Sequence, residues 1–460
     1  MKILLVNPKP VEAYTVYGPS LGLCYISAYL KQRGISTIEG IDLNIDSNED
    51  FDAALNKADL VGVYCSTKAL KPSLEIAEIA KKRGKVVVLG GPHPSVMPEE
   101  VLESPYVDYV ILSEGEESFF ELINAINGSG FIATIDGIGY KDNGLIKINP
   151  RTSYVKNLDS IPFPDRDLFK FDYSKTVTFC ATRGCPYKCA NCQPALSLQT
   201  CAFRMRSVDN VIAELKEVGQ GKIVHFIDND LTVNRKWIKH FCERIVSEGI
   251  KMEWGCQGRV NTLDRDLLYL MRHAGCSSVS VRIESGSQRL LDGFLKKQMN
   301  LKKAESVISD AVAAKMPLHG WFIIGIPSET REDIESTIQF ALSHDFASVG
   351  FSIGTPWPGT MFYKLCKENS WLLSDDWDKY NEKRYSMLKT PHWGPDDISD
   401  YKNIIVNSFR KKDWAINEND FMFGNPYWGK GFVHKKLIRV KIKMRKLVRN
   451  TLKSLGLFKN

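Results

Sequence analysis

Long apolar runs are missing from this sequence of 460 residues. No segment approaches the ~20 consecutive apolar residues that cross a bilayer, so the sequence predicts no membrane-spanning helix. The opening MKILLVNP is typical of a buried strand, is too short for the apolar region of a signal peptide and lacks a cleavage site. The 11 cysteines show no regular pairing, which excludes a disulfide scaffold and favours a reducing compartment. We therefore expect a cytoplasmic protein.

Acidic residues are missing from positions 421–460, which contain 11 Lys or Arg in a chain of net charge +7. Uncharged residues recur between these cations at helical spacing: Leu437, Val440, Met444, Leu447, Thr451 and Leu455. A basic amphipathic helix of this kind favours an anionic membrane surface. The alternative is a helix that packs on the protein body, and nucleic acid, which also attracts such charge, is not expected as a partner. Residues 430–460 thus predict peripheral attachment at the inner face of a membrane.

Three cysteines stand in the order C-x3-C-x2-C at Cys185, Cys189 and Cys192, after a strand pattern at 176–182. Thiolates hold iron–sulfur clusters, and this local spacing lets one loop wrap several irons. Three ligands leave one iron of a four-iron cluster open to a substrate or cofactor. Zinc, which prefers four ligands, is the alternative, with Cys180 as the fourth. Because Cys180 lies on the preceding strand, we expect it to pack in a core as a small hydrophobe instead.

Residues 1–150 alternate apolar strands with helices, which predicts an α/β domain with a doubly wound, Rossmann-like parallel sheet. Ligands of such sheets bind beyond the carboxyl ends of the strands. Polar residues and glycines fall at those ends: Ser66, Thr67, Gly90, Gly91, Glu114, Gly115 and Glu116. Paired glycines let a backbone approach a flat or phosphorylated ligand, although they also simply make tight strand-to-helix turns.

Strand and helix patterns alternate again from residue 170 to residue 375, which predicts a partial parallel (β/α) barrel, and sites in such barrels gather at the carboxyl ends of the strands. Polar or turn residues end the expected strands there: Asp228, Asp230, Arg259, Glu284, Ser285, Gly325, Ile326, Pro327, Thr355 and Pro356. We place the domain boundary near residue 150, with a proline-marked connection over 143–169, so that the barrel with its linker spans 151–375. Residues 376–429 predict a small helical cap over the substrate side. Three tryptophans are expected either to line a pocket or to pack in cores: Trp357, Trp377 and Trp393.

These pieces together resemble the radical S-adenosylmethionine (SAM) enzymes that carry an amino-terminal cobalamin-binding domain. The resemblance covers roughly residues 1–375. In the barrel it rests on TRGCPYKCANC (182–192), FIDNDLT (226–232), RIESGS (282–287), FIIGIPSET (322–330) and TPWPGT (355–360). In the amino-terminal domain it rests on GPSLGLCYISAYLKQRG (18–34), the Gly-Gly-Pro-His turn at 90–93 and SEGEE (113–117).

The resemblance implies a (β/α)6 TIM-like barrel and three cofactors. Cys185, Cys189 and Cys192 would bind a 4Fe–4S cluster. The residues implied to contact SAM are Asp230, Arg259, Glu284, Ser285, Gly325, Ile326 and Pro327. Those implied to line cobalamin are Ser66, Thr67, Gly90, Gly91, Glu114 and Gly115.

Two positions depart from the family pattern. Asp42-Leu43-Asn44 stands where cobalt-ligating methyltransferases have D-x-H-x-x-G, and Ser113 stands where glycine is commoner. The missing histidine implies either cobalamin bound without a protein imidazole or a domain that has lost cobalamin. His93 is the nearest alternative ligand, although a histidine in a turn more often lies at the surface or in a hydrogen bond.

The activity implied by the resemblance is methylation of an unactivated carbon in a small molecule, peptide or lipid, initiated by a 5′-deoxyadenosyl radical. An external one-electron reductant of the flavodoxin or ferredoxin type would be a partner. A radical cyclase or rearrangement enzyme that keeps cobalamin without methyl transfer is the first alternative. The second is a non-catalytic module that binds cobalamin or responds to redox state.

Overall fold

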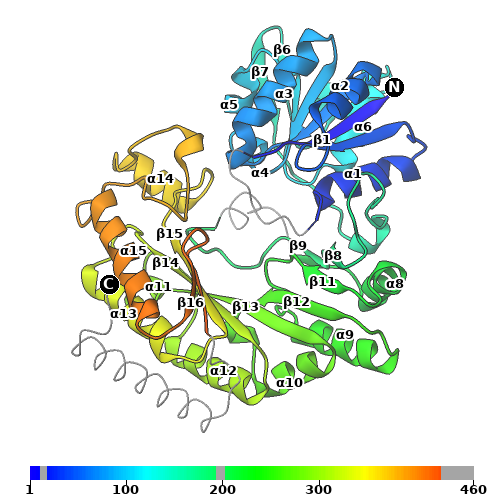
Figure 1. The fold of residues 1–460 in the computed structure, drawn as a ribbon. Coiled ribbons are helices and arrows are strands. Elements are labelled where there is room, and N and C mark those ends of the chain that lie inside the picture. The colour runs from blue at the N-terminus through cyan, green and yellow to red at the C-terminus, as the bar shows by residue number, and fades with distance from the viewer. Residues whose placement is uncertain (11–17, 193–202, 426–460) are drawn as a thin grey trace, which may run out of the picture.

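The structure is a computed structural model, and it describes residues 1–10, 18–192 and 203–425. The basic tail predicted at 430–460 lies outside the described residues. None of the helices described is both long enough and apolar enough to cross a membrane. Figure 1 shows an amino-terminal α/β domain stacked on a second, larger sheet with helices along its outer side.

The amino-terminal sheet has seven strands in the order β2-β1-β3-β4-β5-β6-β7. The pairs among β1 to β5 are parallel, which confirms the predicted doubly wound sheet, and β6 and β7 add an antiparallel hairpin. The strands are β1 (Ile3–Asn7), β2 (Ile38–Asp42), β3 (Leu60–Tyr64), β4 (Val86–Gly90), β5 (Tyr109–Ile111), β6 (Ile138–Asp142) and β7 (Leu145–Asn149). The sequence pattern missed β2, β6 and β7; most residues of β2 and β7 are not buried.

Helices cover both faces of this sheet because its strands carry apolar side chains on alternate sides. Leu4 and Val6 face a core shared with α2, α3 and α5, whereas Ile3 and Leu5 face one shared with α1 and α6. The helices are α1 (Leu21–Gln32), α2 (Asn48–Lys57), α3 (Leu70–Lys82), α4 (Pro92–Val96), α5 (Pro98–Glu103) and α6 (Glu116–Ile126).

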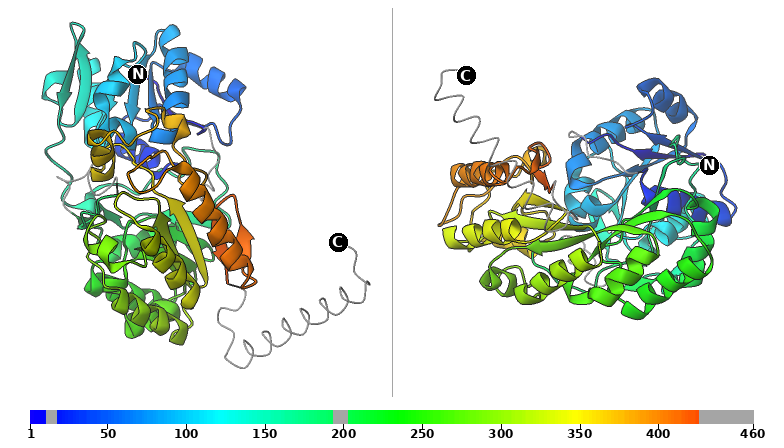
Figure 2. Two further views of the ribbon diagram at one scale, coloured as in Figure 1. Left: turned by 90° about the vertical axis from the view of Figure 1, so that its left-hand side faces the viewer. Right: turned by 60° about the horizontal axis from the view of Figure 1, so that its bottom comes forward.

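The second sheet has eight strands in the order β16-β17-β15-β14-β13-β12-β11-β8. Its strands from β8 to β15 pair in parallel, which confirms the predicted partial barrel. They are β8 (Thr176–Phe179), β11 (Ile223–Phe226), β12 (Glu253–Gly258), β13 (Cys276–Glu284), β14 (Leu318–Ile324) and β15 (Ser348–Ile353). Helices on the outer side of the sheet are α8 (Val208–Val218), α9 (Arg235–Ser247), α10 (Arg265–His273), α12 (Leu301–Ala313) and α13 (Arg331–Ser343), as Figure 2 shows.

The carboxyl-terminal segment is not only helical. It contains α14 (Met361–Glu368), a short turn η5 (Trp377–Lys379), α15 (Pro395–Arg410), β16 (Ala415–Asn417) and β17 (Met422–Gly424). β17 pairs antiparallel with β15 and so extends the barrel sheet. The sequence missed this hairpin because strands of three residues are too short for a periodic pattern.

This segment also joins the two domains. Trp377, Tyr380 and Met387 belong to the core of the amino-terminal domain, whereas Trp393 belongs to the barrel core. Core packing is therefore the role of two of the three tryptophans. Residues 361–424 therefore connect the two sheets, and we call this segment the strap.

An aromatic cluster holds the outer helices on the barrel. Phe241 of α9 is fully buried and makes T-shaped contacts with Phe226 and Trp254 at 5.6 Å between ring centroids. We expect Phe241→Ala to lower the free energy of unfolding by about 3–5 kcal/mol, the usual cost of an aromatic truncation in a core. Val246→Ala, at a 41% exposed position of the same helix, should change it by less than about 0.5 kcal/mol. Urea unfolding followed by fluorescence checks the difference; equal effects would contradict the packing described.

Candidate functional site

The carboxyl ends of both sheets meet at a cavity of about 580 Å³. From the amino-terminal domain it is lined by Ser66, Thr67, Lys68 and Pro92. From the barrel it is lined chiefly by the cysteine loop and the strand ends, including Cys185, Cys189, Cys192, Asp230, Arg259, Arg282, Glu284 and Lys297. Trp357, the third tryptophan, also lines it. Residues that the sequence assigned to three different ligands therefore face one space.

The cysteine loop leaves the barrel through a short ribbon. β9 (Thr182–Arg183) and β10 (Arg204–Met205) pair antiparallel and close the base of the loop, and the three cysteines follow β9. No group of three or more His, Cys, Asp or Glu side chains in the described residues is gathered as it would be around a single metal ion. A four-iron cluster makes a different demand, because its thiolates bind separate irons.

Arg259 lies against this loop. Its Nη1 is 3.6 Å from Cys189 Sγ, its guanidinium stacks 3.7 Å from the centre of the Tyr187 ring, and it also donates to the carbonyl of Lys297. Burial raises the pKa of the Cys185 thiol, which the Arg259 charge partly opposes. A cation here compensates the negative charge of ligating thiolates, so the donor set fits an iron–sulfur cluster.

Cys180 lies apart from these three cysteines. Contrary to the expectation of a core position, it is partly exposed and lines the second cavity described below, not the first. Its Sγ is 3.0 Å from the carbonyl of Thr182, and burial raises its pKa to about 12. A thiol that stays protonated is a poor metal ligand. This environment agrees with the prediction that Cys180 is not a ligand.

Two acids at the end of β11 have different environments. Asp228 accepts hydrogen bonds from the backbone of Ala181 at 3.0 Å and from the backbone and hydroxyl of Thr182 at 2.5 Å, and burial raises its pKa to about 6. It lines neither cavity described here and anchors the start of the cysteine loop. Asp230 bonds Thr232 through Oδ1, whereas its buried Oδ2 has no partner in the described residues. That oxygen fits a donor such as an ammonium or ribose hydroxyl.

Glu284 is held by a partner that the sequence did not reveal. The register of β13 shifts between Arg282 and Glu284, and Lys297 Nζ lies 2.9 Å from Glu284 Oε1 with both side chains 6% exposed. Burial alone would raise the pKa of Glu284, but the charges of Lys297, Arg282 and Arg259 and the hydrogen bond from Lys297 together lower the pKa below its ordinary value. Glu284 is therefore ionised. The sequence alone does not indicate Lys297 as its partner, because a lysine in a loop is usually exposed to solvent.

Four of the residues assigned to SAM do not line either cavity: Ser285, Gly325, Ile326 and Pro327. The hydroxyl of Ser285 is 3.0 Å from that of Thr337. The N–H groups of Gly325 and Ile326 donate to Glu329 Oε2 at 2.5 and 3.2 Å. The carboxyl of the fully buried Glu329 therefore holds this turn in place.

A second cavity of about 450 Å³ enters the amino-terminal domain between its sheet and helices α1 and α6. It is lined by the predicted Gly90, Gly91, Glu114 and Gly115 and by apolar side chains that include Leu5, Leu23, Ile26, Val88, Ile111 and Phe119. Gly91 has φ 120°, and a Cβ there would lie 2.7 Å from the carbonyl of Cys65, so a side chain at this position would be strained. Asn229 and Pro92 line both cavities. A cavity with apolar walls that adjoins the first cavity fits a large ligand with a flat apolar part.

Histidine is not among the described residues that line either cavity. Asn44, at the position of the missing family histidine, is exposed and donates to Asp42 at 2.7 Å. His93 is fully buried behind the cavity wall. Cobalamin bound without a protein imidazole stays a prediction.

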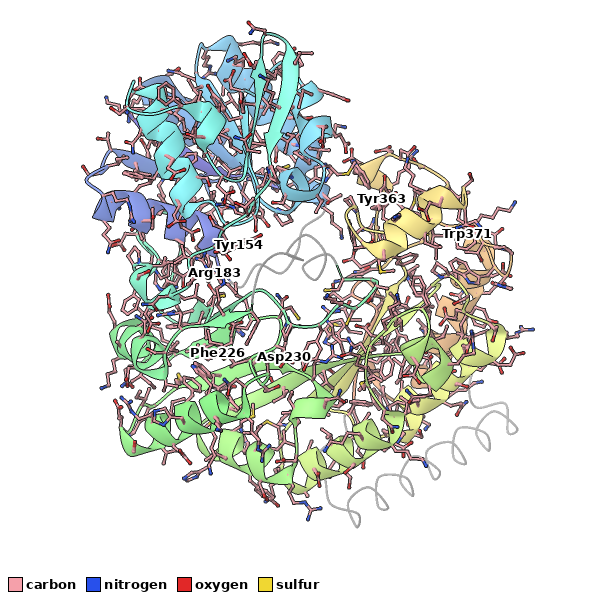
Figure 3. All side chains as sticks on the ribbon, turned by 180° about the vertical axis from the view of Figure 1, so that it is seen from behind. Tyr154, Arg183, Phe226, Asp230, Tyr363 and Trp371 are labelled. Carbon is pink, nitrogen blue, oxygen red and sulfur yellow. The ribbon has the colours of Figure 1, made fainter. Side chains whose placement is uncertain are left out.

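Buried ion pairs join the second cavity to the cysteine loop. Arg183 lies 2.5 Å from Glu116 and 3.1 Å from Glu114, and Arg204 also pairs with Glu114. Figure 3 labels Arg183 where the two domains meet and Asp230 on the barrel side. The sequence assigned Glu114 to cobalamin; in the structure its carboxylate is bound by both arginines of the ribbon.

The buried carboxyl of Glu329 gives a pH-dependent prediction. Burial raises its pKa to about 8, above the ordinary value of roughly 4.3, so its contribution to stability is full below the ordinary value and is lost as pH rises through about 8. The side chain introduced by Glu329→Gln stays neutral at every pH. The free energy of unfolding of this variant minus that of the wild type should therefore rise by on the order of 2 kcal/mol between about pH 6 and pH 8. Denaturant unfolding across this range checks the gain. Glu335→Gln, at an exposed position of α13, is the control, and parallel pH profiles for Glu329→Gln and wild type would contradict the prediction.

Comparison with known proteins agrees with both halves of the site. The B12 binding domain family matches residues 11–123, and the radical SAM superfamily matches residues 179–341. In the solved structures, the radical SAM methyltransferase TsrM from Kitasatospora setae, with cobalamin and a [4Fe-4S] cluster bound, has a TM-score of 0.68 at 19% identity over 80% of this chain and 78% of its own. The cobalamin-dependent SAM radical enzyme OxsB has a TM-score of 0.67 at 18% identity over 100% of this chain and 69% of its own.

Curated relatives extend the match along the whole chain. An anaerobic magnesium-protoporphyrin IX monomethyl ester cyclase of Cereibacter sphaeroides is 27% identical over 91% of this chain and 70% of its own length. An uncharacterized methyltransferase of Pyrococcus horikoshii is 33% identical over 95% of this chain and 97% of its own length. The chain therefore belongs to the radical SAM enzymes with a B12-binding domain, a methyltransferase-containing family whose cofactors are a 4Fe–4S cluster, SAM and cobalamin.

Proposed function

We propose that this chain transfers a methyl group from cobalamin to an unactivated carbon of a small molecule. The observation that carries the proposal is the first cavity, which the three cysteines, Asp230 and Ser66–Thr67 line together. When bound, the cluster with SAM supplies a radical that removes hydrogen from carbon, and cobalamin supplies a methyl group. A substrate in this cavity is within reach of both.

The residues of the chain then hold and orient these groups. Cys185, Cys189 and Cys192 bind the cluster, and Arg259 offsets their charge. Asp230 accepts a hydrogen bond from SAM through its free oxygen, and Glu284, fixed by Lys297, provides a second acceptor. None of these residues carries out the bond-breaking chemistry; they orient the reactants and exclude water.

The wall of the cavity formed by Lys68, Trp357 and Glu382 limits the size of the substrate. Lys68 pairs with Glu382 at 2.7 Å and lies 5.4 Å from the centre of the Trp357 ring, so the strap closes this side. In this proposal the cluster and SAM share the cavity of about 580 Å³ with the substrate, so the space left suits a small molecule or one end of a larger one. A peptide or lipid would enter by one end. We also propose an external flavodoxin or ferredoxin as electron donor, because nothing in the proposed scheme supplies the electron.

Cyclisation is the second candidate, since magnesium-protoporphyrin cyclases are among the relatives at 27% and 28% identity. The test uses the reconstituted enzyme, a low-potential reductant, SAM with a deuterated methyl group and extracts fractionated by size. Methyl transfer predicts 5′-deoxyadenosine together with a product that carries the label. A cyclase would form 5′-deoxyadenosine with an unlabelled product that has lost hydrogen, and a binding module would form no 5′-deoxyadenosine.

The cluster assignment can be tested separately. We expect Cys185→Ala to lose the visible absorbance of the cluster and all 5′-deoxyadenosine formation, because three thiolates are the whole protein ligand set. Cys180→Ala should keep both, because this thiol is protonated, lies against the carbonyl of Thr182 and is outside the first cavity. Iron content and product chromatography check both variants. Loss of the cluster in Cys180→Ala would contradict the ligand set.

A further inference from the structure

Arg282 brings a positive charge to the first cavity. It belongs to β13, where its neighbours Val281 and Ile283 are fully buried in the barrel core, whereas Arg282 is exposed and lines the cavity. Because successive side chains of a strand point to opposite faces of a sheet, its guanidinium lies on the inner face of the barrel. Among the residues that the structure describes, none forms a hydrogen bond or an ion pair with this guanidinium.

Each of the other cations that line the cavity already has a partner. Lys297 lies 2.9 Å from Glu284. Lys68 lies 2.7 Å from Glu382. Arg259 lies against the cysteine loop, where its charge opposes that of the thiolates. The cation on β13 is therefore the one whose charge is available to a ligand.

The surface around Arg282 is polar and open. Gln257 on β12 and Ser352 on β15 also line the cavity, and their amide and hydroxyl can donate hydrogen bonds to oxygen atoms of a ligand. Trp321 on β14 is the register partner of Arg282, but a Cβ added at Gly350 would lie 2.5 Å from its ring. The ring therefore lies over Gly350 and leans away from β13.

A cation without a partner becomes costly once the cavity fills. Water solvates the Arg282 guanidinium while the cavity is open, but bound cofactors and substrate exclude that water, and a desolvated charge needs a counter-charge. The thiolate-bound cluster adds negative charge and SAM adds positive charge through its sulfonium, so these two groups offset each other. The substrate is then the occupant that has to supply negative charge.

We propose that Arg282 binds an oxyanion of the substrate, a carboxylate or a phosphate group, and so selects anionic substrates. A planar guanidinium donates two parallel hydrogen bonds to either group. The inference rests on the proposed function, because it takes the first cavity as the substrate site, but it holds for methylation and for cyclisation alike. Arg282 is a binding residue and takes no part in the radical chemistry.

The first experiment needs no turnover. Butanedione modifies accessible arginines, and its reaction with Arg282 is followed by peptide mass spectrometry in full-length protein loaded with cluster, cobalamin and SAM. A metabolite extract of the native cells, split on an anion-exchange resin at neutral pH, provides the probes. The retained, anionic fraction should slow the modification severalfold, and the unretained fraction should not. Arg331 is the internal reference, because it is 72% exposed on α13 and does not line the cavity.

The second experiment measures 5′-deoxyadenosine formation by the reconstituted enzyme with each fraction. The retained fraction should raise it above the rate without substrate. In Arg282→Met this response should fall about ten- to a hundredfold, the usual effect of losing hydrogen bonds to a charged group. Arg282→Lys keeps the charge but loses the planar fork, so its response should lie in between. Arg331→Met, the matched control, should respond as the wild type does.

Alkaline phosphatase distinguishes the two sources of negative charge. A response that phosphatase removes identifies a phosphate, one that survives identifies a carboxylate, and either supports the proposal. Protection of Arg282 by SAM alone, or loss of the substrate-independent rate in Arg282→Met, would overturn it, because Arg282 would then bind the cofactor. Lack of protection by the retained fraction would overturn it as well. Protection without any 5′-deoxyadenosine from the wild type would support the anion site and contradict the proposed function.

Discussion

The buried ion pairs between Glu114, Glu116, Arg183 and Arg204 fix how the two domains sit. Each charge at 5–17% side-chain exposure depends on its partners, because an unpaired buried charge costs several kcal/mol. Burial would raise the pKa of Glu116, yet the charges of Arg183 and Arg151 and the hydrogen bonds to the carboxylate together lower it. The two arginines belong to the ribbon at the base of the cysteine loop. The same contacts therefore place the cysteine loop and the mouth of the second cavity.

A second set of contacts closes the opposite side. Trp377 is buried in the core of the cobalamin domain and bonds Glu100, while Glu382 pairs with Lys68. Between these two junctions lies the first cavity. Sheets of both kinds bind ligands at the carboxyl ends of their strands, and the two junctions turn those ends toward each other. In the proposed reaction, this arrangement would bring radical formation and methyl donation to one substrate.

The sequence predicted well what depends on local pattern. Buried strands such as β1 and β14 carry enough apolar residues to be recognised, and the C-x3-C-x2-C loop is visible from its spacing. It did not reveal Lys297 as the partner of Glu284. That contact joins the end of β13 to a later loop, beside a shift in strand register, and no sequence pattern predicts such a contact. The sequence also did not reveal that two arginines bind Glu114, which it assigned to cobalamin and which lines the second cavity. The turn at Gly325 resembles a cofactor turn, but its N–H groups are taken by Glu329. Tertiary pairing decides all three, and no local pattern encodes it.

The central claim is that cluster and cobalamin face one cavity lined by Cys185 and Thr67. Pulsed electron paramagnetic resonance tests it most directly, on anaerobic holoenzyme with cobalt(II) and a reduced, paramagnetic cluster. The geometry predicts strong dipolar coupling between the two spins, at a separation no greater than the span of this cavity. Two spins without measurable coupling, in protein fully loaded with both cofactors, would contradict it.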